Sequence, residues 1–441
     1  MNPYFTTNPN DIDEERQPNS FDVDDKSNVY FLQQAYQYHE TLVEDENRPV
    51  LTRNPIYRDR EGAEDHLMGD YFNEPCKYPL YYFRRRYRMS RRLFLKIVEG
   101  ISTYEAGPLL KHFKFFKIQA DCTGRMSLSV IMKCTAAIRQ LAYGTTPDAF
   151  DEYLKMSERT AHDWLLYVNM CIIDLYMSKY LRNPTLEDVE KTYNQHLMRH
   201  GFPGILGSID CMHWEWKQCL VSWQGQYDRG DKKYPTIMLE AVASQDLWIW
   251  HAFFGVAGAN NDINVLDNSP LFDDLLEDKA LVAPFVVNGV GFEKGYYLAD
   301  EIYPQWATFV KSFTVANDAK HSYFKKRQES ARKDVERAFA VLQGRWGIIQ
   351  QPARQYHVNN IRRIMYSCII MHNMILEDQK MAVTDWNKMY ANPSRNMQRT
   401  WVERCETRKA KELRDRETHI SLQPNLMEHV WNEVEHEYED F

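Results

Sequence analysis

The stretch of residues 205–212, ILGSIDCM, constrains the fold more than any other part of this chain. Its side chains alternate between two faces, which is the two-residue period of a strand. A carboxylate, Asp210, stands inside this run, and His213 follows closely. Carboxylates are rarely buried and are depleted from strands. Asp210 therefore either caps a turn or has a functional role.

Further strands and helices follow this run. The stretches YPTIMLEAVASQ and LWIWHAFFGVAG are strand-like and predict an antiparallel meander. A helix is expected in NNDINVLDNSPLFDDLLED, a strand pair in PFVVNG and KGYYLADEIYP, and two long helices in residues 321–346 and 359–379. This order predicts an α/β domain over 196–385, with helices covering a mixed sheet.

The segment before the strands is predicted to be all-helical. Over 126–185, helical spacing, the break at Gly144 and a cap at Ser157 indicate a helix-turn-helix-like domain. Its last helix would expose Arg159, Thr160 and His162 to DNA. The alternative is a helical bundle that only packs on the next domain.

The two ends of the chain are acidic. Residues 1–70 carry a net charge of −10 and residues 426–441 carry −6, so the rest of the chain carries +8. We expect 1–70 to be largely disordered, with a short helix near 29–42, and 386–441 to be a charged helical tail. A basic body between acidic ends is compatible with a nucleic-acid partner, because binding to nucleic acid depends on the local charge of the surface and not on the net charge of the chain.

Residues 71–125 form a basic linker and helix. Six arginines, between Arg84 and Arg92, crowd into nine residues ahead of a helical pattern. They indicate a solvated helix start, a nuclear-import signal or a phosphate-binding arm.

Several classes of protein are disfavoured. The sequence contains no run of eighteen apolar residues, so no membrane span is expected, and the N-terminus lacks the pattern of a signal peptide. Eight widely spaced cysteines suit a reducing compartment. No GxxxxGK[ST] loop is present, so no nucleotide fuel is implied.

Two more acids complete a constellation with Asp210. Asp300 ends the apolar strand GYYLAD, although it could instead start the following loop. Glu336 lies at the edge of the apolar stripe of the helix ESARKDVERAFAVLQ, where it could also pair with Arg332 one turn back. Two strand aspartates and a helix glutamate suit two Mg²⁺ or Mn²⁺ ions, which prefer oxygen ligands and catalyse in-line displacement at phosphorus. Such ions would also relieve the repulsion among the three carboxylates.

The pattern resembles the PIF/Harbinger transposases and their domesticated, nuclease-like relatives. The resemblance spans residues 85–380 and is strongest from GSIDCMHW through GYYLADEIYP and QESARKDVERAFAVLQGRW to YSCIIMHNMI. It implies an RNase H-like fold whose DDE triad falls on Asp210, Asp300 and Glu336. Asp262, in GANNDINVL, matches a further acidic position of the family; it is either a fourth acid near the metals or the N-cap of the next helix.

Basic residues near these acids are candidate phosphate contacts. They are Arg229, Lys232 and Lys233 in the loop GQYDRGDKKY, and Arg332, Lys333 and Arg337 on the helix of Glu336. Glu240, inside a strand, is left unassigned. Cys211, His213 and Cys219 are expected to pack around the first aspartate, and Cys368 and His372 to belong to a core helix.

The favoured function is a transposase or endonuclease that cleaves and joins DNA with two divalent metal ions. The alternatives are a domesticated DNA-binding or chromatin-associated protein without cleavage activity, and a structure-specific host nuclease. The resemblance also implies a Myb-like or trihelix-like partner protein. We further expect a nuclear location and a homo-oligomer. The acidic C-terminal helix is either solvated or docks on a basic partner surface.

Overall fold

The computed structural model describes residues 32–37, 56–384 and 416–439, except Ala106, 122–123, 274–281 and Asn317; in residues 381–384, 416–420 and 433–439 it describes only the backbone. The chain divides into two units, Met1–Arg58 and Asp59–Phe441. In the first, a helix covers residues 32–37, within the short helix predicted there. The rest of the predicted disordered region up to residue 55, and the predicted tail over 386–415, lie outside the described residues.

Helices build the first half of the second unit, which confirms the helical prediction for 126–185, whereas α2 was not expected because residues 1–70 were predicted to be largely disordered. The helices are α2 (Arg60–Tyr71), α3 (Leu80–Tyr87), α4 (Arg91–Thr103), α5 (Lys111–Lys114), α6 (Val130–Tyr143), η2 (Pro147–Phe150), α7 (Asp151–Leu154), α8 (Glu158–Tyr180) and α9 (Leu186–His200). The Ser157 hydroxyl caps α8 by accepting the N–H of Thr160, and Gly144 ends α6 in the left-handed conformation. None of the helices in the described ranges is long and apolar enough to cross a membrane.

A mixed sheet of five strands follows, in the order β3-β2-β1-β6-β7. Its strands are β1 (Ile205–Glu215), β2 (Thr236–Ala243), β3 (Ile249–Ala257), β6 (Tyr296–Ala299) and β7 (Phe309–Lys311). The first three form the predicted antiparallel meander, and β6 and β7 run parallel to β1. The long connection from β1 to β2 contains α10 (Val221–Tyr227).

Both strands predicted near residue 290 are present, but they do not pair with each other. β4 (Phe285–Val287) pairs instead with β5 (Val290–Phe292) in a separate hairpin, and β6 joins the main sheet beside β1. Asn288 and Gly289 both have positive φ, 50° and 77°, and they form the two-residue turn that an Asn-Gly sequence favours. This turn closes β4 on β5 before β6 begins.

The predicted helix over 260–278 is interrupted at Ser269, and residues 274–278 lie outside the described residues. α11 covers Asp262–Asn268, and the 3₁₀ turn η3 (Pro270–Phe272) follows. Pro270 lacks the N–H that a continuing helix needs and restricts Ser269, so the helix ends before it.

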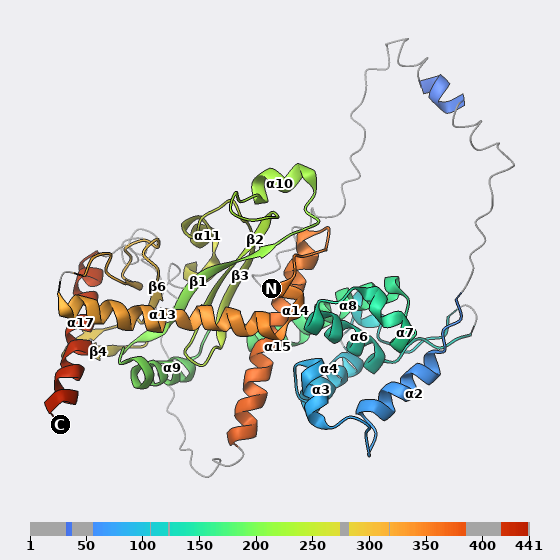
Figure 1. Ribbon diagram of the computed structural model, residues 1–441, viewed down its shortest axis with the longest axis horizontal. Coiled ribbons are helices and arrows are strands. Elements are labelled where there is room, and N and C mark those ends of the chain that lie inside the picture. The colour runs from blue at the N-terminus through green and yellow to red at the C-terminus, as the bar shows by residue number, and fades with distance from the viewer. Residues whose placement is uncertain are drawn as a thin grey trace. The chain divides into compact units, whose positions relative to one another are not determined.

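Helices cover both faces of the sheet (Figure 1). On one face lie α13 (Ala319–Arg345) and α17 (Arg416–Glu439), whose buried Leu422, Leu426 and Val430 join a core with Phe324 and Leu298. The opposite face receives Leu266 of α11 and Phe272 of η3 against Ile209 and Phe309. α14 (Gly347–Gln350) leads from α13 to α15 (Val358–Thr384).

Helix α15 ties the helical half to the edge of the sheet. The buried amide of Asn373 accepts the N–H of Ile249 at 3.1 Å and donates to the carbonyl oxygens of Ile249 and Tyr180, at 2.8 and 2.7 Å. One side chain thus satisfies three backbone groups from β3 and the end of α8.

Replacing Asn373 with Ala should therefore destabilise the whole unit. Each buried backbone group left without a partner costs roughly 1–3 kcal/mol, so we expect the free energy of unfolding to fall by about 3 kcal/mol or more. Urea denaturation followed by circular dichroism measures this. Asn359→Ala, at an exposed position of the same helix, is the matched control. Equal stability of the two variants would contradict the assignment.

Candidate active site

The register of two parallel strands brings two aspartates to one rim of the sheet. Ser208 of β1 pairs with Leu298 of β6. Asp210, inside β1, and Asp300, directly after β6, each lie two residues further along, so they lie at the same level and on the same face of the sheet. That face is covered by α13, because the Ser208 hydroxyl donates to the carbonyl oxygen of Ala331 at 3.1 Å.

Asp210 is largely buried, with a side chain that is 20% exposed. Its Oδ1 accepts the backbone N–H of Cys211 at 2.8 Å, and its Oδ2 lies 3.4 Å from the guanidinium of Arg332. Burial raises the pKa of Asp210 to about 6, the Cys211 N–H and Arg332 oppose this, and the carboxylates of Asp262 and Glu336 raise the pKa further. The raised pKa therefore reflects burial first, and the smaller effects of Asp262 and Glu336 show that both acids lie within electrostatic reach of Asp210.

Glu336 comes from α13, as predicted, at the edge of a buried stripe that contains Val335, Ala338 and Phe339. Its Oε1 lies 2.9 Å from Arg332, one turn earlier on the helix. The ion pair considered from the sequence therefore exists. Its arginine also faces Asp210, so one guanidinium bridges a strand carboxylate and a helix carboxylate.

Asp262 is not the cap of α11. The N-cap is Asn261, whose side chain accepts the N–H of Asn264, and Asp262 is the first residue of the helix. Burial raises the pKa of Asp262, the Cys211 thiol and Arg229 lower it, and Asp300 and Glu240 raise it. The structure thus brings Asp262 to the same rim, beside Cys211.

Asp300 is exposed at the end of β6. Its Oδ1 accepts the N–H of Glu301 at 2.7 Å, and its carbonyl oxygen accepts the N–H of Tyr303. It therefore starts the following loop, and it lies within electrostatic reach of Asp262, whose pKa it raises. Asp210, Asp300 and Glu336 do not form a group whose ligand atoms all lie within 4.8 Å; of the residues that the structure describes, His196, His200 and Asp334 form such a group.

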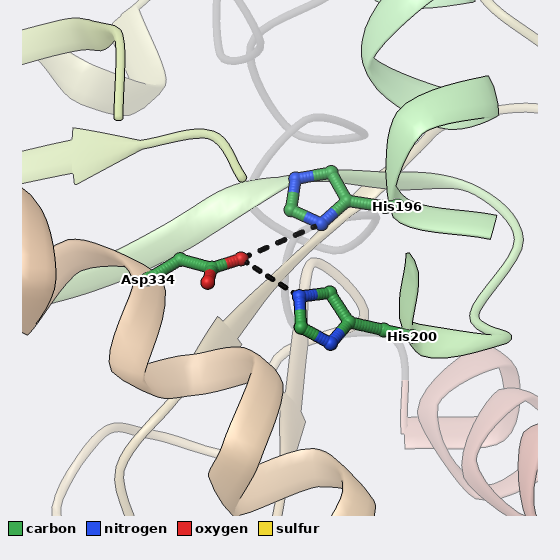
Figure 2. A group of neighbouring side chains, drawn as sticks. All are labelled: His196, His200 and Asp334. Carbon is green, nitrogen blue, oxygen red and sulfur yellow. Dashed lines mark hydrogen bonds and ion pairs between the residues drawn. The ribbon is translucent and has the colours of Figure 1, made fainter. Parts of the chain in front are cut away.

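That second group was missed from the sequence. His196 and His200 are spaced i, i+4 on α9, and Asp334 faces them from α13 (Figure 2). The HxxxH spacing of 196–200 was a usable signal, because it places both imidazoles on one side of a helix. Asp334 gave no comparable signal, since it lies among other charges in ESARKDVER.

Some of the basic residues expected to bind phosphates contact other protein side chains, and the others are exposed. Arg229 contacts His213 and Asp231, Arg332 bridges Asp210 and Glu336, and Arg337 pairs with Asp334. Lys232, Lys233 and Lys333 are exposed, as is Arg159, which lies 3.6 Å from Asp163.

Thr160 and His162 of the candidate recognition helix form hydrogen bonds with other residues of the chain, and several arginines of the run between Arg84 and Arg92 contact aromatic or acidic side chains. The Thr160 hydroxyl bonds to Ser157, and His162 bonds to Gln355. In the arginine run, Arg86 lies over Tyr78 at 4.3 Å, and Arg91 and Arg92 each form an ion pair at 2.7 Å.

The other cysteines and histidines have local partners. His213 bonds to Thr236, and Cys211 lies 3.7 Å from the Tyr303 hydroxyl. Cys368 and His372 are fully buried, and His372 bonds to the carbonyl oxygen of Leu247 at 2.9 Å, as expected for a core histidine.

Glu240 lies across from Cys211 in the sheet and is fully buried. Its Oε1 contacts His251 and Ser269, and its Oε2 has no hydrogen-bond partner. It raises the pKa of Asp262, so it belongs to the electrostatic surroundings of the rim.

Comparison with known proteins adds to this geometry. Residues 178–383 match a family described as plant transposon protein, and residues 64–102 match a domain of unknown function. The chain is 23% identical over 262 residues to Protein ALP1-like of Arabidopsis thaliana, a match that covers 58% of this chain and 63% of that protein. The match thus spans less than two thirds of the relative's length. No solved structure matches the chain.

Replacing Asp210 with Asn should stabilise the metal-free protein. Because the pKa of Asp210 rises from 3.8 to about 6 on folding, the folded chain binds more protons between these values, and its stability falls as the pH rises through this window. Two pKa units correspond to about 3 kcal/mol, which is an upper bound for the gain at neutral pH.

Urea denaturation with a chelator, at about pH 7.5 and again near pH 4, measures this gain. We expect it to be present at the higher pH and to vanish at the lower one. Asp267→Asn, at an exposed position of α11, is the control. A variant that is less stable than the wild type at pH 7.5 would show that the ion pair with Arg332 outweighs burial.

Proposed function

The chain is related to the PIF/Harbinger transposases, and on this premise we propose that it is a metal-dependent DNA nuclease of the DDE type. Asp210, Asp300 and Glu336 are the proposed catalytic acids, and Asp262 is a fourth metal-proximal acid. The observation that carries the proposal is the placement of Asp210 and Asp300 on neighbouring strands of one rim, with Glu336 coupled to Asp210 through Arg332. The mixed sheet also supports the RNase H-like fold that the resemblance implies.

The donor set fits hard divalent cations. All four acids offer oxygen, which Mg²⁺ and Mn²⁺ prefer, and the raised pKa of Asp210 shows that the rim disfavours negative charge. Two such ions would activate a water and stabilise the leaving oxygen in strand cleavage, and would serve the attack of the freed 3′-hydroxyl on target DNA. The role of the protein would be to hold the carboxylates in place on two rigid strands and a long helix.

Arg332 then has two roles. In the free protein its guanidinium offsets the charges of Asp210 and Glu336. With cations bound to these acids, Arg332 would no longer be needed to offset their charge, and its guanidinium would be available to pair with a DNA phosphate.

The same arginine favours the second candidate function. A chain whose acids are neutralised internally needs no metal at the rim, which suits a domesticated DNA-binding or chromatin-associated protein without cleavage activity. Cleavage by the purified protein separates the two functions, and the same assay on branched and flapped substrates tests a structure-specific host nuclease.

Alanine variants of the triad test the enzyme directly. With Mg²⁺ or Mn²⁺ and duplex DNA that carries the element ends, we expect nicking by the wild type and a loss of at least roughly 100-fold for Asp210→Ala, Asp300→Ala or Glu336→Ala, since each removes a ligand. Asp262→Ala should lower activity without lowering the melting temperature. The matched control on the same helix is Asp267→Ala.

Wild-type rates in any triad variant would overturn the assignment of that residue. A wild-type protein that binds DNA but nicks none with either metal would favour the domesticated function.

We further propose that the exposed lysines of the β1–β2 connection contact DNA phosphates. Lys232→Ala and Lys233→Ala should each weaken binding by a similar factor on all sequences, and should lower the slope of log K against log salt by about 1. Fluorescence anisotropy over a salt series measures both quantities. Lys191→Ala, at an exposed position of α9, is the control, and a slope unchanged in both loop variants would contradict the contact.

Sequence-specific binding is proposed to need a second protein, Myb-like or trihelix-like, in a nuclear homo-oligomeric complex. The helix-turn-helix-like role of α6–α8 is part of this proposal, with Arg159 as its exposed base. One exposed arginine is little for base readout, which usually adds to several phosphate contacts. Titration of labelled element ends, with and without the partner, tests this dependence. Tight, specific binding by the chain alone at physiological salt would contradict it.

A further inference from the structure

A second group of possible metal ligands lies between α9 and α13, apart from the four acids of the rim. His196 and His200 come from the last turns of α9, and Asp334 comes from α13 (Figure 2). All three side chains are at least nine-tenths buried, with residue exposures of 0%, 6% and 0%. Buried imidazole and carboxylate groups need partners, and here they face one another.

The spacing of the donor atoms suits a single ion. Oδ2 of Asp334 lies 3.0 Å from Nε2 of His200 and 3.8 Å from Nδ1 of His196. Ligands held about 2.1 Å from a tetrahedral ion are about 3.4 Å apart, and the two observed distances lie on either side of this value. The longer one is too long for a hydrogen bond.

One of these atoms makes no hydrogen bond. Nδ1 of His196 is buried, makes no hydrogen bond and points toward Asp334 (Figure 2). The second carboxylate oxygen of Asp334 pairs with Arg337, so Oδ2 is left to the two histidines. An outer partner of this kind typically fixes the orientation of a metal-binding carboxylate.

We propose that His196, His200 and Asp334 form a binding site for a borderline divalent cation, Zn²⁺ above all, that pins α9 to α13. Two imidazoles and a carboxylate suit zinc, and three protein ligands leave one tetrahedral position for water. The rim acids offer only oxygen, so the two sites differ in the metals that they select.

The hydrogen bond on the far side of His196 gives this site a signature. Nε2 of His196 accepts the backbone N–H of Gln245 at 3.3 Å. A metal on Nδ1 requires the proton to sit on Nε2, so metal binding breaks this long bond. The loss exposes the Gln245 amide, at the turn between β2 and β3, to exchange.

The site would act on the helix that carries Glu336. Asp334 lies two residues before Glu336 and two after Arg332, so an ion that fixes Asp334 also fixes the rotation of α13 over the sheet. The inference does not rest on the proposed nuclease, because it concerns only zinc binding and the packing of two helices.

Zinc binding by the full-length chain tests the proposal. After chelator treatment, Zn²⁺ is titrated in excess Mg²⁺ against a chromophoric chelator, and bound metal is counted by atomic emission. We expect one tightly bound zinc per chain, tetrahedral absorption bands when Co²⁺ replaces it, and faster hydrogen exchange at Gln245 in the loaded protein.

Variants locate the ion. His196→Gln, His200→Gln and Asp334→Asn should each weaken zinc binding by roughly tenfold or more, with circular dichroism as the check on folding. The control His357→Gln, at an exposed histidine, and Asp210→Asn, at the rim, should bind zinc as the wild type does.

Two results would overturn the site. One is a folded wild-type chain that binds no zinc. The other is a His200→Gln chain that binds zinc as tightly as the wild type. If the variants do not fold, the cobalt bands and the exchange at Gln245 in the wild type decide, and their absence overturns the proposal.

Discussion

The parallel pairing of β1 with β6 is the constraint on which the α/β half of this chain depends. Parallel neighbours require a long crossover, and the meander, α11 and the β4–β5 hairpin fill it before the chain returns as β6. Because the two strands run the same way, Asp210 of β1 lies beside Asp300, which follows the end of β6. Helix α13 crosses the same face and brings Glu336, which Arg332 links to Asp210, so the topology decides which acids lie near one another.

Placing several carboxylates near one another costs electrostatic free energy, and a residue of α13 offsets part of this cost. Asp210 loses most of its water and lies within reach of Asp262 and Glu336, which together raise its pKa. Arg332 is placed by its helix between Asp210 and Glu336, at 3.4 and 2.9 Å. The helix that adds a carboxylate to the rim therefore also supplies the cation that makes the rim tolerable without metal.

The sequence predicted those features that depend on local pattern. A carboxylate within an alternating strand, Asp210, and another at the edge of an apolar stripe, Glu336, were both readable, and both lie where expected. The pairing of β4 with β5 depended on a local Asn-Gly turn that was overlooked. The contact of His200 with Asp334 joins residues 134 positions apart, and no local pattern encodes it. Likewise, the placement of Arg332 between two acids depends on how α13 lies on the sheet.

Both edges of the sheet end on side chains rather than on open backbone. Along β3, three residues on one side of α15 meet the strand: Asn373 at Ile249, Tyr366 at Ala252 and Phe254, and Arg362 at Phe254. Gly255 makes room for Arg362, since an added Cβ would lie 2.5 Å from its guanidinium. At β7, Gln423 of α17 donates to the carbonyl oxygen of Lys311. Another strand could therefore pair with either edge of the five-stranded sheet only by displacing these side chains from the backbone groups that they occupy.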